Sequence, residues 1–389
     1  MNSRAALFLV AASCAAPQKP PTAAERDLHS RALVVDAHCD VTQDIVYQGY
    51  DFAQRHAAGD HHEDLPRDRE GGLDAQIFSI WVDPGQFPKE KYFAEAEHQL
   101  LALIAELPKA QGLALARSGQ EIRANEKTGA MSALFGVEGG HMLQPGSPDE
   151  QLAHLRRFAA LGARYLTLTW SNSNDVGGSS GDEGRVLGLT DFGRKVIAEM
   201  ERLGIVVDLS HVSDPLFWDA IRAVRRPVIA SHSSSRQLAN VPRTLTDAQL
   251  EAIGKKGGAV CVNFFIGFLD AEAFDQLKAM EKELDPQKKL PALELQRLVR
   301  ARYLAKGKKV PLSAVADHIQ HIAQVAGVDH VCLGSDFDGI PLAPVGLDDA
   351  TRLPDLTAEL LRRGMSEAEV RKVLGENLLR VLDANAPAP

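Results

Sequence analysis

Short apolar runs recur along the chain from about residue 31 to about residue 383, and longer amphipathic segments separate them. Apolar runs bounded by turn residues are typical of parallel strands that are buried on both faces. The segments between the runs have the periodicity of helices, as at Phe93–Ala105, Glu150–Leu161, Asp191–Leu203 and Ser313–Ala326. We expect eight strands, at Leu33–Ala37, Ala75–Trp81, Ala133–Val137, Tyr165–Thr169, Val206–Leu209, Val228–Ala230, Ala259–Asn263 and His330–Leu333.

The boundaries of the predicted helices support the same alternation. Thr246, with Gln249 three residues later, has the pattern of a capping box, and Thr190 precedes another helix. Gly162 and Gly204 follow predicted helices in the position of C-terminal caps. Strands that alternate with helices form parallel sheets with crossover helices, and eight such units make a closed barrel. We therefore predict an α/β fold, a (β/α)8 barrel of the TIM type.

Side chains suited to metal binding or proton transfer stand at the ends of these apolar runs. In a (β/α)8 barrel, the carboxyl ends of the strands form one face, and the active site lies there. Imidazoles, a His-x-Asp pair and a glutamate are the set that a two-metal hydrolase needs. We therefore predict a metallohydrolase with a dinuclear metal site at this face. The site residues are His38, Asp40, Glu138, His211, His232 and Asp336.

The spacing of these residues predicts how they share two ions. His38 and Asp40 are two residues apart at a strand end, so both point to the same face and can bind one ion. Glu138, flanked by glycine, can bridge two ions about 3.5–4 Å apart, although a helix-cap role is the alternative. His211 and His232 each follow a serine at the end of an apolar run, which favours a shared second ion over two separate core histidines. A water between two such ions has its pKa lowered to about 7.

Two further residues are expected to handle the proton and the substrate. Asp336 is the expected general base and acid, which takes a proton from the bridging water and passes it to the leaving amine. Asp338 is the alternative, but it precedes Gly339 and is expected to shape a turn. Arg243 is expected to bind a substrate carboxylate in bidentate fashion, with a surface arginine as the alternative.

Composition and charge exclude some classes of function. The net charge of −9 argues against nonspecific nucleic-acid binding, which needs a basic surface. No apolar run reaches the roughly 20 residues that a membrane-spanning helix needs. The length of 389 residues suits one large barrel domain, which we place at residues 28–383. Two segments depart from the strand–helix repeat: Gly49–Arg69, a polar loop whose histidines we expect to be solvated, and Phe264–Lys309, a charged insertion of helical pattern.

The first 16 residues have the composition of an export signal. Residues 11–14 are similar to a bacterial lipoprotein box, which would make Cys14 a lipid anchor; cleavage after Ala15 or Ala16 and a retained N-terminus are the alternatives. We expect a linker at residues 17–27, a disordered tail at residues 384–389, and a periplasmic or cell-envelope location. No Cys-x-x-Cys spacing exists, so the sequence does not support a zinc site of thiolates. Cys39, Cys261 and Cys332 fall in or beside the predicted strands and are expected to be small buried core residues rather than disulfide partners.

Taken together and in order, several motifs resemble the membrane dipeptidase (renal dipeptidase) family, the M19 group of zinc peptidases within the amidohydrolase-like barrels. The matching motifs are Val35–Asp40, Gly136–His141, Arg164–Thr169, Asp208–His211, Ser231–His232 and Leu333–Gly339. The segment from Pro354 to Leu382 is also similar to the family's terminal helices, so the resemblance covers about residues 28–383.

The resemblance implies two zinc ions per chain, dipeptide substrates that include those with a C-terminal D-residue, and a homodimer. It implies Asp336 as the proton shuttle and Arg243 as the contact for the terminal carboxylate of the substrate. It also implies one ion on His38, Asp40 and Glu138, and the other on Glu138, His211 and His232, so that Glu138 bridges.

One position departs from the family. A histidine that contacts the substrate commonly follows the Thr-Leu-Thr run, and here Trp170 stands in its place. Indole offers one N–H donor and no charge, and Asn172 or Asn174 is a candidate substitute. Two alternatives to a dipeptidase therefore stay open. One is an amidase or lactonase on the same barrel, and the other is a metal-binding surface protein without activity.

Overall fold

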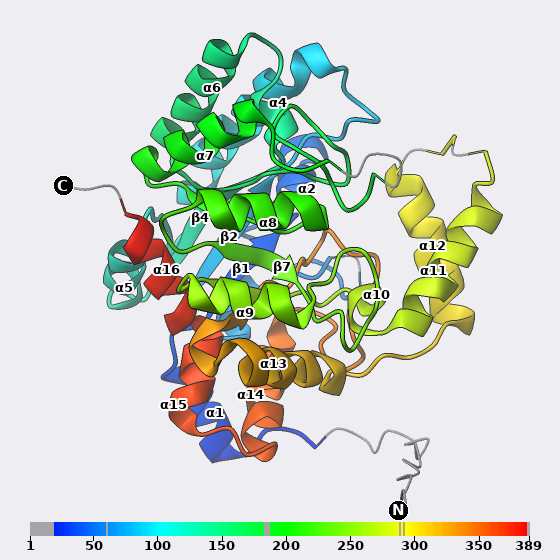
Figure 1. The fold of residues 1–389 in the computed structure, drawn as a ribbon. Coiled ribbons are helices and arrows are strands. Elements are labelled where there is room, and N and C mark those ends of the chain that lie inside the picture. Colours follow the sequence, from blue (N-terminus) through cyan, green and yellow to red (C-terminus); the bar gives the residue numbers. More distant parts are fainter. Residues whose placement is uncertain (1–18, 60, 183–186, 288, 291, 387–389) are drawn as a thin grey trace, which may run out of the picture.

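The computed structural model describes residues 19–386 except 60, 183–186, 288 and 291. Within this part, eight parallel strands form a ring in the order β2–β1–β9–β8–β7–β6–β5–β4, which closes where β2 pairs with β4 (Figure 1). The prediction of a (β/α)8 barrel is confirmed. The ring strands are β1 (Val35–Cys39), β2 (Ala75–Ile80), β4 (Met131–Glu138), β5 (Ala163–Thr167), β6 (Val206–Asp208), β7 (Ile229–Ser233), β8 (Ala259–Val262) and β9 (Val331–Leu333).

The ring strands coincide with the eight strands expected from the sequence, and one short strand was missed. The missed strand is β3 (Leu113–Leu115), which pairs with the start of β4 at Met131. The end of β4 pairs instead with β5, so β3 lies outside the ring. Three residues are too few to show a period, which is why the sequence pattern did not reveal β3.

Helices surround the ring (Figure 1). Helices α7 and α13 have the predicted bounds, and Thr246 forms the predicted capping box with Gln249. Gly162 and Gly204 end their helices in the left-handed conformation, at φ 109° and 72°. The α-helices are α1 (Ala23–Ser30), α2 (Thr42–Tyr47), α3 (Leu65–Glu70), α4 (Tyr92–Glu106), α5 (Gly119–Glu126), α6 (Pro148–Leu161), α7 (Asp191–Leu203), α8 (Asp214–Ala223), α9 (Asp247–Lys255), α10 (Ile266–Leu269), α11 (Ala271–Leu284), α12 (Ala292–Lys306), α13 (Ser313–Ala326), α14 (Leu353–Arg362), α15 (Glu367–Arg371) and α16 (Asn377–Asn385).

The prediction for two of the cysteines was wrong. Cys261 on β8 and Cys332 on β9 form a disulfide, and Cys39 is a buried free thiol as expected. The two bonded residues are register partners in neighbouring strands, with Cα atoms 4.1 Å apart. A sequence separation of 71 hides this pairing, because it follows only from the register of the two strands.

The ends of the folded domain also differ from the prediction. Thr22 and Glu25 form a capping box at the start of α1, and Leu28 of this helix is buried, so residues 23–27 are not part of a linker. Helix α16 runs to Asn385, whose buried side chain donates to the carbonyl of Pro227. The predicted signal peptide and the end of the predicted tail lie outside the described residues.

The insertion between β8 and β9 is helical, as predicted. It contains α10, α11 and α12, and Figure 1 shows α11 and α12 together at one side of the barrel. Among the described residues, no helix is long and apolar enough to cross a membrane.

Candidate metal centre

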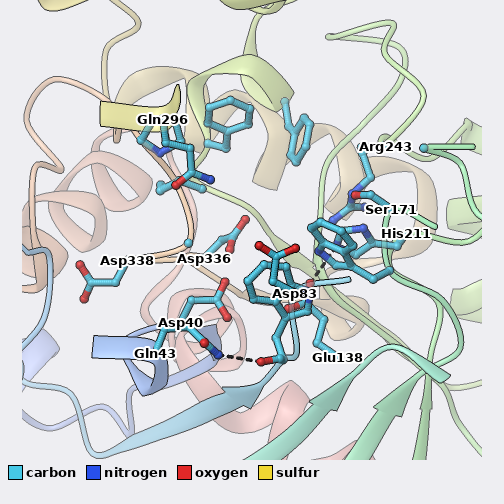
Figure 2. A pocket seen from close by; sticks show the side chains of 18 of the residues that line it. Asp40, Gln43, Asp83, Glu138, Ser171, His211, Arg243, Gln296, Asp336 and Asp338 are labelled. Carbon is cyan, nitrogen blue, oxygen red and sulfur yellow. Dashed lines mark hydrogen bonds and ion pairs between the residues drawn. The ribbon is translucent and has the colours of Figure 1, made fainter. Parts of the chain in front are cut away.

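The predicted site residues meet at the carboxyl ends of the strands. His38 lies near the end of β1, Glu138 ends β4, and His232 lies on β7. His211 follows β6 by three residues, and Asp336 follows β9 by three residues. Figure 2 shows Asp40, Glu138, His211, Arg243 and Asp336 together at the pocket.

The carboxylate of Glu138 lies between two sets of side chains. Its Oε2 atom is 3.6 Å from Nε2 of His38. Its Oε1 atom is 2.9 Å from Nε2 of His211 and 3.5 Å from Nε2 of His232. Asp40 stands on the His38 side, with Oδ2 3.7 Å from Nε2 of that histidine. Each oxygen of Glu138 therefore faces a different group of potential metal ligands.

The donor atoms at this site fit metal ions. Nε2 of His38 and Oδ1 of Asp40 are buried and have no hydrogen-bond partner among the described residues. The Nε2 atoms of His211 and His232 are 2.9 Å apart, and both approach Oε1 of Glu138. Buried polar atoms without partners are costly, and a cation bound between them removes that cost. Two groups of three have their ligand atoms within 4.8 Å of one another: His38, Glu138 and His232, and His38, Asp40 and Asp336.

Hydrogen bonds with Tyr165 and Asp36 hold His38 in position. Its Nδ1 atom lies 2.7 Å from the hydroxyl of Tyr165, which comes from β5 across the barrel. The buried Asp36 carboxylate accepts the backbone N–H groups of His38 and Ser335, which ties the end of β1 to the segment that leads to Asp336.

His232 is held in a similar way, by a buried carboxylate that binds backbone N–H groups and by a hydroxyl beside the Nδ1 atom of its ring. The Asp208 carboxylate accepts the backbone N–H groups of Ser210 and Ser231, which ties β6 to β7. The Ser231 hydroxyl donates to Asp208 at 2.6 Å and lies 2.8 Å from Nδ1 of His232. Groups that hold the second ring nitrogen of a metal-binding histidine fix its orientation and its tautomer.

Asp336 is positioned by a residue that the sequence did not single out. Asn263, which follows β8, donates its side-chain N–H to Oδ2 of Asp336 at 2.8 Å. The other oxygen, Oδ1, faces Nε2 of His38 at 4.0 Å. Asp336 and His211 both have left-handed backbones, at φ 62° and 66°, which is uncommon outside glycine and typical of constrained sites.

Burial and neighbouring charges shift the pKa values of the site residues in different directions. Burial, with help from Arg243, lowers the pKa of His211 to about 4, and burial also lowers the pKa of His232 well below its usual value. Both imidazoles are therefore neutral at pH 7, which is the form that binds metals. Burial opposes ionisation of Glu138, but the nearby imidazoles hold its pKa well below the usual value. Burial raises the pKa of Asp336 to about 8, and the Asp40 and Glu138 carboxylates add to this rise.

Arg243 and Trp170 both line the pocket, as expected for substrate contacts. Arg243 donates to the carbonyl of His232 at 3.2 Å, and burial lowers its pKa to about 10, so the guanidinium is charged. The Trp170 ring lies 4.8 Å from the ring of Trp81 and 6.3 Å from the ring of His211. Asn174 uses its side-chain N–H and carbonyl groups to hold the backbone of Leu168 and Val176. Neither Asn172 nor Asn174 is among the residues that line the pocket, so their role as substitute donors stays a prediction.

The loop after β1 also differs from the prediction. His61 and His62 are only 24% and 12% exposed, so they are not fully solvated as expected. Asp338 accepts the backbone N–H groups of His62 and Glu63, at 2.7 and 3.3 Å, and has φ 63°. The turn role predicted for Asp338 is confirmed, and the turn also anchors this loop beside the site.

The chain matches known proteins over nearly its whole length. The model of the membrane dipeptidase family, peptidase family M19, matches residues 22–388. The chain belongs to this family. It is therefore a metal-dependent hydrolase of the dipeptidase class, as the resemblance implied.

Solved structures described as dipeptidases or metallo peptidases share the fold. The probable dipeptidase PvdM from Pseudomonas aeruginosa is 24% identical, with a TM-score of 0.79, over 93% of this chain and 97% of that chain. A metallo peptidase called dipeptidase AC is 28% identical, with a TM-score of 0.75, over 92% and 99% of the two chains. A metallo peptidase from Rhodobacter sphaeroides, bound to a phosphinate mimic of the dipeptide L-Ala-D-Ala, is 27% identical, with a TM-score of 0.75, over 91% and 99%.

Proposed function

We propose that the protein is a zinc dipeptidase that holds two zinc ions, one on His38, Asp40 and Glu138 and one on Glu138, His211 and His232. The observation that carries this proposal is the position of the Glu138 carboxylate. Its two oxygens face two different histidine groups, as a bridging ligand requires. The imidazole and carboxylate donors of the site suit zinc, which binds nitrogen and oxygen ligands of this kind. When bound, zinc supplies Lewis acidity, which lowers the pKa of a water and polarises a carbonyl.

The residues of the chain handle the proton. Hydrolysis joins the water oxygen to the carbonyl carbon, breaks the C–N bond, and transfers a proton from the water to the leaving nitrogen. Asp336 performs this transfer in our proposal, because Asn263 holds its Oδ2 while its Oδ1 faces the ligand cluster. The left-handed backbone at Asp336, with φ 62°, supports this role, because such conformations in residues other than glycine are typical of constrained sites.

Arg243 binds the terminal carboxylate of the dipeptide in this proposal. Its charged guanidinium lines the pocket that contains Glu138 and Asp336. Arginine recognises carboxylates through paired hydrogen bonds. A C-terminal D-residue is among the proposed substrates, and the L-Ala-D-Ala mimic bound to the relative from R. sphaeroides supports this.

A second candidate is an amidase or lactonase activity on the same site. Trp170 favours it, because indole replaces the histidine that the family resemblance leads one to expect, and neither Asn172 nor Asn174 is among the residues that line the pocket. The substrate panel described below separates the two activities.

Export to an oxidising compartment is part of the proposal, with Cys14 as the proposed site of lipid attachment. The disulfide between Cys261 and Cys332 supports export, since disulfides persist in secreted and periplasmic proteins and are rare in the cytosol. A homodimer stays a prediction from the family resemblance.

The proposal is tested by hydrolysis of L-Ala–L-Ala, L-Ala–D-Ala, N-acyl amino acids and lactones with zinc-loaded protein. We expect cleavage of dipeptides, and we expect Asp336→Asn to lower kcat by about 100-fold or more with zinc content unchanged, because the proton shuttle is lost.

Asp329→Asn is the matched control, since Asp329 precedes the same strand at the opposite end of the barrel and is expected to leave kcat unchanged. Cleavage of lactones or N-acyl amino acids alone would replace the dipeptidase proposal with the second candidate. Full dipeptidase activity of Asp336→Asn would refute the role of Asp336.

A further inference from the structure

The pocket over the metal ligands is larger than a small dipeptide requires. Its volume is about 620 Å³, and it reaches from Glu138 and Asp336 to helices α11 and α12 of the insertion (Figure 2). Cavities of about 300–1,000 Å³ enclose drug-sized ligands. A dipeptide of two alanines, with only methyl side chains, leaves much of this space unfilled.

Aromatic and aliphatic side chains of the insertion line one wall of the pocket. The insertion contributes Phe265, Phe268, Phe274 and Leu277. The lining residues Lys278 and Glu281 of α11 pair with each other at 2.7 Å, and the Lys278 ammonium also lies 5.7 Å from the centre of the Phe274 ring, so both charges have partners within the helix. This wall, which we call the insertion wall (Phe265, Phe268, Phe274 and Leu277), therefore suits an apolar group rather than a charged one.

Arg243 indicates which end of the substrate meets the insertion wall. Its guanidinium lies 5.1 Å from the centre of the Phe268 ring, and the Phe265 ring lies 4.9 Å from that of Phe268. A terminal carboxylate bound by Arg243 therefore brings the side chain of the C-terminal residue next to these rings. The N-terminal residue, on the other side of the scissile bond, is farther from Arg243.

We propose that the enzyme prefers dipeptides whose C-terminal residue has a large apolar side chain, such as leucine or phenylalanine. This inference rests on the proposed dipeptidase function and adds the substrate class. The insertion wall buries the side chain, and apolar burial of this kind changes kcat/KM by about 10- to 100-fold relative to alanine.

The test compares kcat/KM for dipeptides that start with L-Ala and end with Ala, Leu, Phe, Lys or Glu, each in L and D form. We expect the Phe and Leu substrates to exceed the Ala substrate by about 10-fold or more. We expect Phe274→Ala and Phe265→Ala to reduce this ratio by about 10-fold. Both side chains are partly exposed and line the pocket. Phe265 also packs against the hydrophobic core, so the thermal stability of each variant is measured alongside, and Phe274→Ala carries the test if Phe265→Ala is destabilised.

Leu304→Ala is the matched control, because Leu304 lies on α12 of the same insertion, is 64% exposed and does not line the pocket. It should leave the Phe-to-Ala ratio at the wild-type value. Equal rates for all C-terminal residues, a preference for Lys or Glu, or a ratio unaffected by both phenylalanine variants would overturn the inference while the dipeptidase function stands. Absence of cleavage for every dipeptide would overturn the proposed function itself.

Discussion

The contact between Tyr165 and His38 decides which nitrogen of His38 is free to bind a metal. If Nδ1 carries the proton and donates it to the Tyr165 hydroxyl, the lone pair of Nε2 points into the site. Burial raises the pKa of Tyr165, so its hydroxyl stays neutral. Gly136 makes room for this ring, since a Cβ atom there would lie 1.9 Å from Cζ of Tyr165.

Tyr165→Phe is expected to weaken zinc binding by about 10- to 100-fold, because the phenyl ring keeps the packing but loses the hydrogen bond to His38. Competition with a zinc chelator measures this affinity. Tyr303→Phe is the control, since its hydroxyl donates to the carbonyl of Lys308 in the insertion. An unchanged zinc affinity of Tyr165→Phe would show that this hydrogen bond does not orient His38.

The sequence predicted the residues that carry the chemistry better than the residues that position them. His38, His211 and His232 follow a strand-end pattern that is visible along the chain. Tyr165 and Asn263 could not be found in this way, because their partners lie 127 and 73 residues away and meet them only in the closed barrel.

At the scale of elements, carboxylates that are buried or partly buried tie neighbouring strands together. Asp36 and Asp208 do this at the carboxyl ends of the strands, and Asp74 does it at the opposite end. The Asp74 side chain, just before β2, accepts the backbone N–H of Val34, just before β1, at 2.8 Å. Burial raises the pKa of Asp74 to about 6 from its usual 3.8.

The raised pKa of Asp74 makes stability depend on pH. Because the folded state holds this proton more tightly than the unfolded state, the contribution of Asp74 to the free energy of unfolding falls as pH rises from 3.8 to about 6 and is constant above. Asp74→Asn keeps an acceptor oxygen and cannot ionise. Between about pH 4 and about pH 8, wild type therefore loses stability that Asp74→Asn keeps. We expect the difference in the free energy of unfolding between the two proteins to change by on the order of 1–2 kcal/mol over this range, in favour of Asp74→Asn.

Urea unfolding of wild type and Asp74→Asn at both pH values measures this effect. Any pH-independent change caused by the substitution cancels in the comparison. A stability difference of the same size at both pH values would contradict the assigned cause.

Elements were predicted well where the pattern is local. The apolar runs gave all eight barrel strands, and the capping residues gave the ends of α7 and α9. The disulfide was missed because the register between two paired strands cannot be deduced from the sequence of either strand alone. Helix α1 was missed because its first turns lie in a polar segment, although Thr22 and Glu25 form a capping box there.

At the scale of the whole molecule, the barrel and the insertion contribute different parts of the site. The barrel brings residues from five strands, separated by up to about 300 positions, to one metal site at its carboxyl face. The insertion between β8 and β9 lines one wall of the pocket at that face, so in our proposal the barrel sets the geometry of the metal site and the insertion sets the size of the substrate. This arrangement is common in barrels, whose loops vary while the strands hold the site.

The most direct test of the central claim, a metal-dependent dipeptidase with a bridging Glu138, is a zinc titration of chelator-stripped protein. Activity toward an alanyl dipeptide and bound zinc are measured on the same samples. We predict no activity without metal and a plateau at about two zinc ions per chain. Full activity of the metal-free protein, or a plateau at one ion, would contradict the claim.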